Sequence, residues 1–344
     1  MLNTLKYTGL VFFSAMMLLN QNVLAADDAD SSPKFSGYMF GDYYWAAKSH
    51  NPDIEDKNGF QFRRIYLTMD KNVNENFDIR FRLEAGNPGD FSSTSKIEPF
   101  AKDAWLRYKN GAHSIYMGLS PTPSVELVDK HWGYRSVEKS ALDLNKFASS
   151  RDFGVKFSGT LGAKGKARYN LMLANGAGTK TEVSPGKKVI GTLGFQVAEG
   201  LMIDFIGDYE ARPGDANRST MQAFLSYSGS QGRIGALYAR QTRQGVNTLH
   251  LDVTSIYGVA NFNPRLNGYI RWDRMYDPNP DGEKISYYPF DKTAKSNFIL
   301  IGLDYTPHED VHIMPNIEYT FYNPKAGADV NPDFMPRMTM WYLF

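Results

Sequence analysis

The stretch from Asn76 to Gly86, NFDIRFRLEAG, alternates apolar and charged side chains along its whole length. Successive side chains of a β-strand lie on opposite faces, so this pattern predicts one apolar and one charged face. The apolar face consists of Phe77, Ile79, Phe81, Leu83 and Ala85, and the charged face of Asp78, Arg80, Arg82 and Glu84. Soluble β-sandwiches alternate too, but faces so densely charged in strand after strand are typical of a wall between lipid and water.

The same alternation recurs along the chain, and it predicts which side chains face lipid and which face the lumen. Expected toward lipid are Leu249, Leu251, Val253, Tyr257, Ile313, Ile317 and Phe321, and toward the lumen His250, Asp252, Thr254, Asn316, Glu318 and Thr320. Two irregularities stand out. The run FQFRRIY slips phase between Phe62 and Ile65, and we interpret Pro315 as a β-bulge because proline cannot donate to a strand ladder.

Sixteen such segments follow one another, with links that alternate in length. Their expected first residues lie near positions 34, 58, 76, 100, 112, 151, 165, 187, 200, 218, 232, 248, 265, 295, 310 and 335. Short links are expected near 71–75, 110–111, 162–164, 199, 229–231, 263–264 and 307–309, and long ones near 49–57, 88–99, 121–150, 177–186, 211–217, 243–247, 277–294 and 323–334. Short periplasmic turns and longer outer loops are typical of outer-membrane barrels. The fold class predicted is therefore an all-β, transmembrane antiparallel barrel of sixteen strands, wide enough for an aqueous channel.

Both ends of the chain agree with export to a membrane. Lys6 precedes an apolar run at 7–19 that is followed by small residues, which predicts a signal peptide over 1–25 and a barrel domain over 26–344. After Leu19 no apolar run is long enough for a spanning helix. The last residues, RMTMWYLF, predict a closing strand whose lipid-facing residues are Met338, Met340, Tyr342 and Phe344.

The composition argues against several other classes of protein. The chain has no cysteine and a net charge of +1, which excludes disulfide and thiolate chemistry and gives no sign of nucleic-acid binding. His113 and Ser114 are neighbours, and neighbouring strand residues face opposite sides, so they do not form a catalytic dyad by themselves. The segment HED at 308–310 falls in a short turn. The segment DPNPDGE at 277–283 offers acids for a divalent cation on the outer surface, but it lacks the full calcium-loop spacing, which favours a solvated loop. We therefore expect no enzyme activity, no cofactor and no metal site.

The longest link, Pro121 to Ser150, is the third outer loop and contains three large aromatic residues, so we expect it to be ordered. Its place in the chain predicts that it folds into the barrel and narrows the lumen. The alternatives are a loop that caps the outside or packs on a neighbouring subunit. Its charged residues are Lys130, Arg135, Lys139, Lys146, Glu126, Asp129, Glu138 and Asp143, four of each sign.

Two stretches resemble the phosphate-selective porin O/P family of Gram-negative bacteria. They are GFQFRRIYLTMDKNVNENFDIRFRLE, at 59–84, and SSRDFGVKFSG, at 149–159. The terminal Phe344 also resembles the sorting signature of outer-membrane barrels. The resemblance implies a sixteen-stranded porin in the outer membrane, assembled as a homotrimer and passing small anions. The balanced charges of the long loop depart from the lysine-rich constriction of that family, so phosphate is one candidate solute among several.

Charged side chains on the inner wall are the candidates for solute selection. Those expected to line the lumen are Arg64, Arg80, Arg82, Arg107, Lys156, Arg168, Arg271, Asp78, Glu84, Asp103, Asp204, Asp208 and Asp273. Arg64, Arg80 and Arg82 are expected to form one patch opposite the third loop. The alternative for these arginines is purely structural, as partners of acids on neighbouring strands. Two other functions stay open, a phospholipase-like barrel enzyme and an exported adhesin-type β protein.

Overall fold

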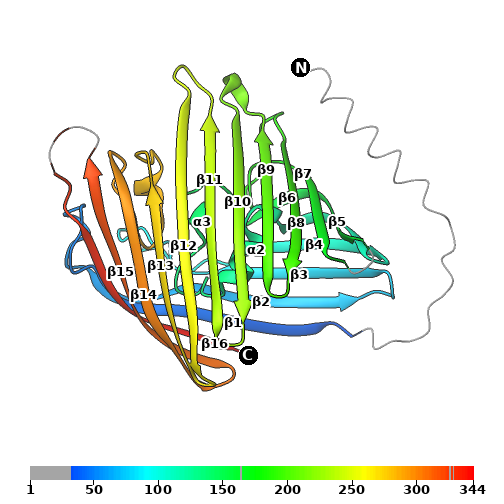
Figure 1. The fold of residues 1–344 in the computed structure, drawn as a ribbon, viewed down its shortest axis with the longest axis horizontal. Helices are drawn as coiled ribbons and strands as arrows, with labels where there is room; N and C mark the ends of the chain where they lie inside the picture. The colour runs from blue at the N-terminus through cyan, green and yellow to red at the C-terminus, as the bar shows by residue number, and fades with distance from the viewer. Residues whose placement is uncertain (1–31, 163–164, 325–326, 328) are drawn as a thin grey trace. The chain divides into compact units, whose positions relative to one another are not determined.

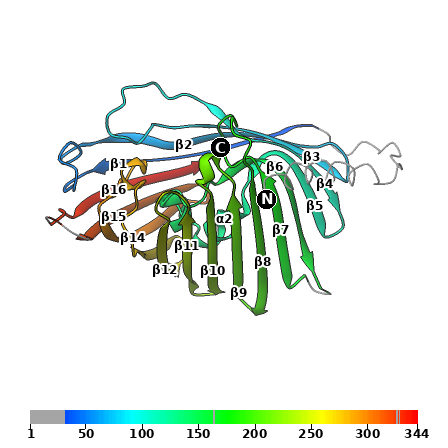
Figure 2. The same cartoon turned by 90° about the horizontal axis from the view of Figure 1, so that it is seen from above.

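The computed structural model describes residues 32–162, 165–324, 327 and 329–344. Within this part of the chain, sixteen antiparallel strands pair with their sequence neighbours, and β1 pairs with β16 to close a barrel (Figures 1 and 2). The predicted signal peptide, 1–25, lies outside the described residues. The strands are β1 (Lys34–Trp45), β2 (Asn58–Asn72), β3 (Phe77–Ala85), β4 (Phe100–Asn110), β5 (His113–Pro121), β6 (Arg151–Leu161), β7 (Ala167–Ala174), β8 (Lys188–Ala198), β9 (Leu201–Glu210), β10 (Arg218–Gly229), β11 (Gly232–Arg243), β12 (Leu249–Asn263), β13 (Leu266–Met275), β14 (Ala294–His308), β15 (Val311–Pro324) and β16 (Asp333–Leu343).

The strand count and the alternation of short and long links confirm the predicted architecture. Every strand begins within two residues of its expected position. Short turns such as 111–112 and 230–231 lie at one end of the barrel, and the long loops lie at the other. Among the described residues, no helix is long and apolar enough to cross a membrane.

The last strand closes the barrel as its sequence predicts. Its register with β1 runs from Tyr38 opposite Leu343 to Tyr44 opposite Arg337, and Gly37 and Phe344 exchange two backbone hydrogen bonds of 2.9 Å. Met340 is 46% exposed on the outer surface, whereas its neighbour Thr339 is fully buried inside. The outer apolar stripe of this strand therefore continues the apolar outside of the barrel.

The predicted facing of side chains holds for β3 and β15. Phe81 and Phe321 are exposed on the outside of the barrel, and Asp78 and Glu318 are buried inside it. The expected phase slip in β2 is a β-bulge, because Phe40 pairs with Arg64 while Gly41 pairs with Phe62. This bulge leaves Arg63 as the extra residue.

Two expectations about strands are wrong. The phase of β12 is reversed, because Leu251 and Val253 are completely buried inside the barrel while Ile256 is exposed on its outside. The reason is that the inner face of β12 is covered by the folded third loop and so must be apolar. Pro315 does not sit in a bulge: it lies opposite Met338 in an unbroken register with β16, and the nearest shift is between Tyr305 and His308.

Two long loops fold into the barrel from the end that carries the long loops. The loop between β5 and β6 contains α2 (Pro123–Trp132) and α3 (Ala141–Leu144), and these helices lie behind β9 to β12 in Figure 1. The loop between β13 and β14 contains the short 3-10 helix η3 (Gly282–Lys284), and η2 (Pro213–Asp215) lies between β9 and β10. Large apolar residues of both inward loops join the main buried cluster, which confirms the inward-folded third loop and adds a second one.

Candidate functional site: the interior of the barrel

The inner faces of β2 to β6, here called the charged wall, carry ionised side chains that pair across strands. Arg80 on β3 lies with its Nε 2.7 Å from Oδ1 of Asp70 on β2. Two residues further along the same strand, Arg82 lies 3.5 Å from Asp103 on β4, and its Nε donates to Thr68 at 2.8 Å. The pairing follows from the register, because Asp70 lies opposite Arg80 and Thr68 opposite Arg82.

Acids at the two ends of β3 are paired in the same way. Glu84 lies 2.8 Å from Arg64 of β2 and 2.8 Å from Lys102 of β4. Asp78 accepts hydrogen bonds from Arg107. The three arginines expected to form one patch, Arg64, Arg80 and Arg82, thus lie on one wall, but each is bound to a different acid. Both readings of these arginines, as solute-selecting groups and as structural partners, remain compatible with this geometry.

A cavity of about 350 Å³ lies against the charged wall, between the strands and the start of the third loop. Two of its guanidinium groups remain partly open, since the side chains of Arg80 and Arg107 are 29% and 31% exposed. Four basic and three acidic side chains line it, so its net charge is +1. They are Lys71, Arg80, Arg107, Lys156, Asp70, Asp78 and Glu126, joined by Trp105 and Tyr116.

The third loop begins with a helix whose signals are readable in the sequence. Pro123 occupies the first turn of α2, where its missing N–H costs nothing, and Gly133 ends the helix with φ of 76°, a conformation that favours glycine. One face of α2, including Val125, Val128 and Trp132, is buried. The helix therefore packs its apolar face on the barrel interior.

Most charges of the third loop are neutralised within the loop or by the wall. Arg135 lies 3.1 Å from Asp129 and 2.6 Å from Asp143. Burial lowers the pKa of Lys139 to about 8, despite the nearby carboxylate of Glu138. Lys130 and Lys146 are exposed.

Glu126 is the loop acid that faces the cavity. Its side chain is half exposed and lies 3.5 Å from Nζ of Lys156 on β6. Lys156 itself is buried and also donates to the carbonyl of Pro121 at 3.0 Å. The rim of the cavity thus combines a loop carboxylate with a wall ammonium.

A buried ion network that no sequence pattern indicated fixes the third loop to the strands that close the barrel. Arg337 on β16 lies 2.8 Å from Glu318 and 3.0 Å from Asp42 on β1. Arg63 on β2 lies 3.8 Å from the same Asp42 and 2.7 Å from Glu138 of the loop. All five side chains are almost completely buried. The signal for Arg63 was the phase slip in FQFRRIY, because the bulge turns both consecutive arginines inward.

Arg271, expected to line the lumen, instead supports the loop. It is buried, its Nε lies 2.9 Å from Asp273, and its guanidinium donates to the carbonyl of Lys139. Its guanidinium also lies 5.6 Å from the ring centre of Trp132. Further along the barrel, Arg168 lies 4.0 Å from Asp204, and Lys188 lies 3.1 Å from Asp208.

The inner faces of β10 to β14, here called the covered wall, carry apolar residues against which the third loop packs. Trp132 packs edge-on against Tyr257 with ring centres 5.0 Å apart. The ring centres of Tyr134 and Tyr269 are 4.2 Å apart. Gln241 donates to the carbonyl of Phe147 at 2.8 Å. The buried apolar residues of this wall are Phe224, Leu237, Ala239, Leu251, Val253, Tyr257, Val259, Tyr269, Met275, Ala294, Phe298 and Leu300.

The second inward loop, 276–293, crosses the interior to the charged wall. Tyr287 receives a hydrogen bond from Arg64 at 3.1 Å and donates to the carbonyl of Arg63 at 3.1 Å. Asn279 donates to the carbonyl of Asn145, which joins the two loops at 3.0 Å. The expectation of a simple solvated loop at 277–283 is wrong for this reason. The sequence does contain a sign of the inward path of this loop: the run ISYYPF at 285–290 is more apolar than a solvated loop needs to be.

The barrel resembles solved outer-membrane proteins in fold. An anion-selective porin from Comamonas acidovorans matches with a TM-score of 0.67 and 10% identity, over 91% of this chain and 99% of that one. OmpT of Vibrio cholerae with loop L8 deleted, an outer membrane protein, matches with a TM-score of 0.65 and 12% identity, over 92% and 100%. OmpF of Salmonella typhi, solved with daunomycin, matches with a TM-score of 0.64 and 12% identity, over 91% and 97%.

These likenesses show the fold alone, since the sequence identities are only 10–12%. No protein-family model and no curated protein matches the chain.

Proposed function

We propose that this chain forms a water-filled channel in the outer membrane of a Gram-negative bacterium, through which small hydrophilic solutes diffuse. The observation that carries the proposal is the contrast between the two faces of the same strands. On β3 the outward Phe81 is exposed, whereas the inward Asp78 and Arg80 hold ion pairs beside an open cavity. Such strands suit hydrocarbon outside and water inside.

We propose further that the channel prefers small anions modestly. The net charge of +1 on the cavity lining and the partly open guanidinium groups of Arg80 and Arg107 favour an oxyanion, which guanidinium binds well. The paired acids limit the preference, because each one cancels most of the field of its partner. Phosphate, which the family resemblance implies, is one such anion. The anion-selective porin among the structural neighbours agrees with this direction.

The test is the reversal potential of the refolded protein in planar bilayers under a potassium chloride gradient. Replacing Arg80 and Arg82 by Gln removes two positive charges from the wall, so the reversal potential should shift toward that of K⁺. The matched control is Arg240→Gln, because Arg240 lies on the outside of β11 in an ion pair with Asp252. No current from the native protein would refute the channel. An unchanged reversal potential in the double variant would remove these arginines from selection.

Maturation and assembly are parts of the same proposal. The exported protein would begin at residue 26 after removal of the predicted signal peptide, which N-terminal sequencing checks. A homotrimer is implied by the family resemblance, and in-vitro folded OmpT of Vibrio cholerae, with a TM-score of 0.61 and 12% identity, is described in a trimer form. The mass of the refolded assembly distinguishes a trimer from a single barrel.

A further inference from the structure

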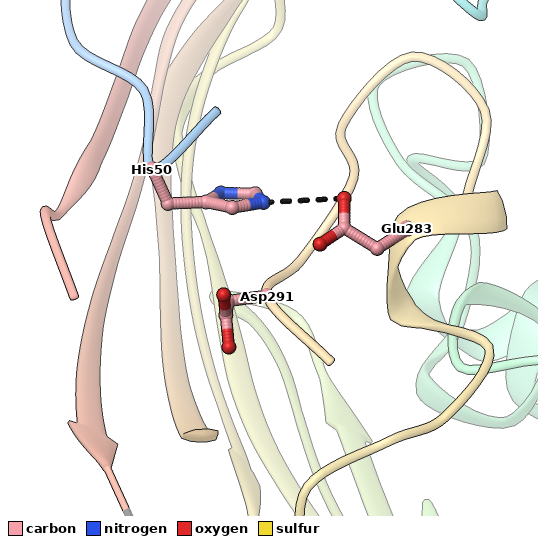
Figure 3. A group of neighbouring side chains, drawn as sticks. All are labelled: His50, Glu283 and Asp291. Carbon is pink, nitrogen blue, oxygen red and sulfur yellow. Dashed lines mark hydrogen bonds and ion pairs between the residues drawn. The ribbon is translucent and has the colours of Figure 1, made fainter. Parts of the chain in front are cut away.

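Three side chains converge at the outer end of the barrel, away from the cavity of the charged wall. They are His50 from the loop between β1 and β2, and Glu283 and Asp291 from the second inward loop (Figure 3). One possible ligand atom from each lies within 4.8 Å of the other two. Glu283 points toward the His50 ring, with its carboxylate 3.5 Å from Nε2 (Figure 3).

The histidine is held rigidly, and its orientation favours a metal ligand. Its side chain is only 3% exposed, and its Nδ1 lies 2.8 and 2.9 Å from the two carboxylate oxygens of Asp333. The backbone N–H of His50 donates to the same carboxylate at 2.7 Å, and Tyr322 donates its hydroxyl proton there as well. A carboxylate behind Nδ1 places the ring proton on Nδ1 and leaves the Nε2 lone pair facing outward, the arrangement found behind metal-binding histidines.

Among the residues that the structure describes, no lysine or arginine forms an ion pair with Glu283 or Asp291. The lone pair of Nε2 and the carboxylates of Glu283 and Asp291 are all acceptors, so they repel one another unless a proton or a cation lies between them. Asp291 is oriented by Thr293, whose N–H and hydroxyl donate to one of its oxygens at 2.7 and 2.6 Å. Asp291 therefore presents its carboxylate from a fixed turn, while the more exposed Glu283 is able to adjust.

We propose that His50, Glu283 and Asp291 bind one divalent transition-metal ion of the Zn²⁺ type, with Asp333 as the buried carboxylate behind the histidine. One imidazole nitrogen and two carboxylates form a donor set that suits Zn²⁺ and its neighbours, whereas Ca²⁺ and Mg²⁺ prefer oxygen ligands alone. Bonds of about 2.0–2.2 Å require the three ligand atoms to approach one another slightly. The sequence suggested a divalent cation only for the acids of 277–283, and no local pattern relates Glu283 to His50, which lies far away along the chain.

The position of the site gives the ion a mechanical role. The ion would connect the loop after β1 with the second inward loop. The second inward loop carries Tyr287, which forms hydrogen bonds with Arg63 and Arg64. Tyr287 has φ of 73°, a conformation that is costly for a residue other than glycine, so this loop needs tertiary contacts to keep it in place. A bound ion would thus hold the second inward loop in the barrel.

The test is a calorimetric titration of the refolded full-length protein with Zn²⁺, which reads binding without reference to conduction. We expect one saturable site per chain, and Ca²⁺ and Mg²⁺ should not compete for it. Glu283→Gln should weaken Zn²⁺ binding on the order of tenfold or more, because it removes the charge of one ligand. Glu283 is exposed, so this substitution should leave the fold intact. His50→Gln should weaken binding similarly. The control is His308→Gln, because His308, Glu309 and Asp310 in the turn at the other end of the barrel form a second group whose ligand atoms lie within 4.8 Å of one another. This variant should bind Zn²⁺ as the native protein does.

The outcomes separate this proposal from its rival and from the channel proposal. The rival is a protonated His50 that donates to Asp333 and Glu283 with no metal at all. A titration without a saturable site, or one that Glu283→Gln and His50→Gln leave unchanged, overturns the metal site. Saturable binding in a protein that passes no current would preserve the metal site while refuting the channel.

Discussion

The charged wall and the covered wall belong to the same barrel and face the same interior, yet they obey different rules. On the charged wall, β2 to β6, inward positions carry Asp78, Arg80 and Arg107, each in an ion pair beside a cavity. On the covered wall, β10 to β14, inward positions carry residues such as Leu251 and Phe224, which are sealed under the third loop. Ionised inward residues therefore border the open cavity on the charged wall, whereas apolar inward residues lie under the third loop on the covered wall.

The largest effect is expected from a substitution that weakens the packing of the third loop against the covered wall. Trp132→Ala removes an indole that is 1% exposed and donates to the carbonyl of Glu138 at 3.0 Å. We expect docking of the loop to lose about 3–5 kcal/mol, as for large buried aromatic residues. Single-channel conductance should rise, and trypsin should cleave the loop faster at Lys139 and Lys146.

The matched variant for this experiment is Trp45→Ala, which truncates a tryptophan that is exposed on β1. It should leave conductance and cleavage as in the native protein. If Trp132→Ala behaves like Trp45→Ala in both measurements, the third loop is not held by its apolar contacts with the covered wall.

The reversed phase of β12 gives a sharper test on a single strand. Leu251→Ala should lower the free energy of unfolding by about 2–5 kcal/mol, because it leaves a cavity between the strand and the loop. Ile256→Ala should cost less, since lipid chains can fill the space outside. Urea titration of both variants, refolded in lipid vesicles, measures the difference. A larger loss for Ile256→Ala would mean that β12 faces the way its alternation first suggested.

The smallest expected effect is a pH dependence of loop docking through His131. Burial and the nearby Arg233 lower the pKa of His131 to about 4, from its usual 6.5. The docked loop therefore favours the neutral ring, whose nitrogens lie 2.7 Å from the Tyr257 hydroxyl and 3.0 Å from the Ser228 hydroxyl. Docking should be strongest above pH 6.5 and weaken as the pH falls toward 4, because protonation then favours the undocked loop.

We expect this weakening to be smaller than the effect of either truncation, since the His131 ring is only partly buried. Trypsin cleavage of the loop at pH 7 and at pH 5 measures it. The variant His131→Gln should remove the difference between the two pH values. A native protein whose cleavage is equally slow at both would show that His131 does not contribute to docking.

The sequence predicts the barrel well because strand facing is a local property. Alternation of two residue classes needs no knowledge of the rest of the chain, and it located all sixteen strands, the closing strand and the bulge near Arg63. It misassigned β12 because both faces of that strand are partly apolar. Which face turns inward depends on Trp132 and its neighbours, more than a hundred residues away along the chain.

The contacts of the interior were harder to predict for the same reason. The ion network of Asp42, Arg63, Glu138, Glu318 and Arg337 joins both ends of the chain to a loop, and no local pattern relates these positions. The sequence indicated only that Glu318 faces inward. The inward path of the second loop could be predicted in part from the sequence, because ISYYPF at 285–290 is more apolar than a solvent-exposed loop requires.

The same network sets an order on assembly. Arg63 holds Glu138 of the third loop and shares Asp42 with Arg337, a residue of the final strand. Until that strand is in place, Glu318 lacks Arg337 and Asp42 has only the more distant Arg63, at 3.8 Å, so burying these two acids would be costly. We therefore expect β1 and β16 to pair before the third loop docks inside the barrel. In a chain that ends before β16, the third loop would stay undocked and the lumen would not be narrowed.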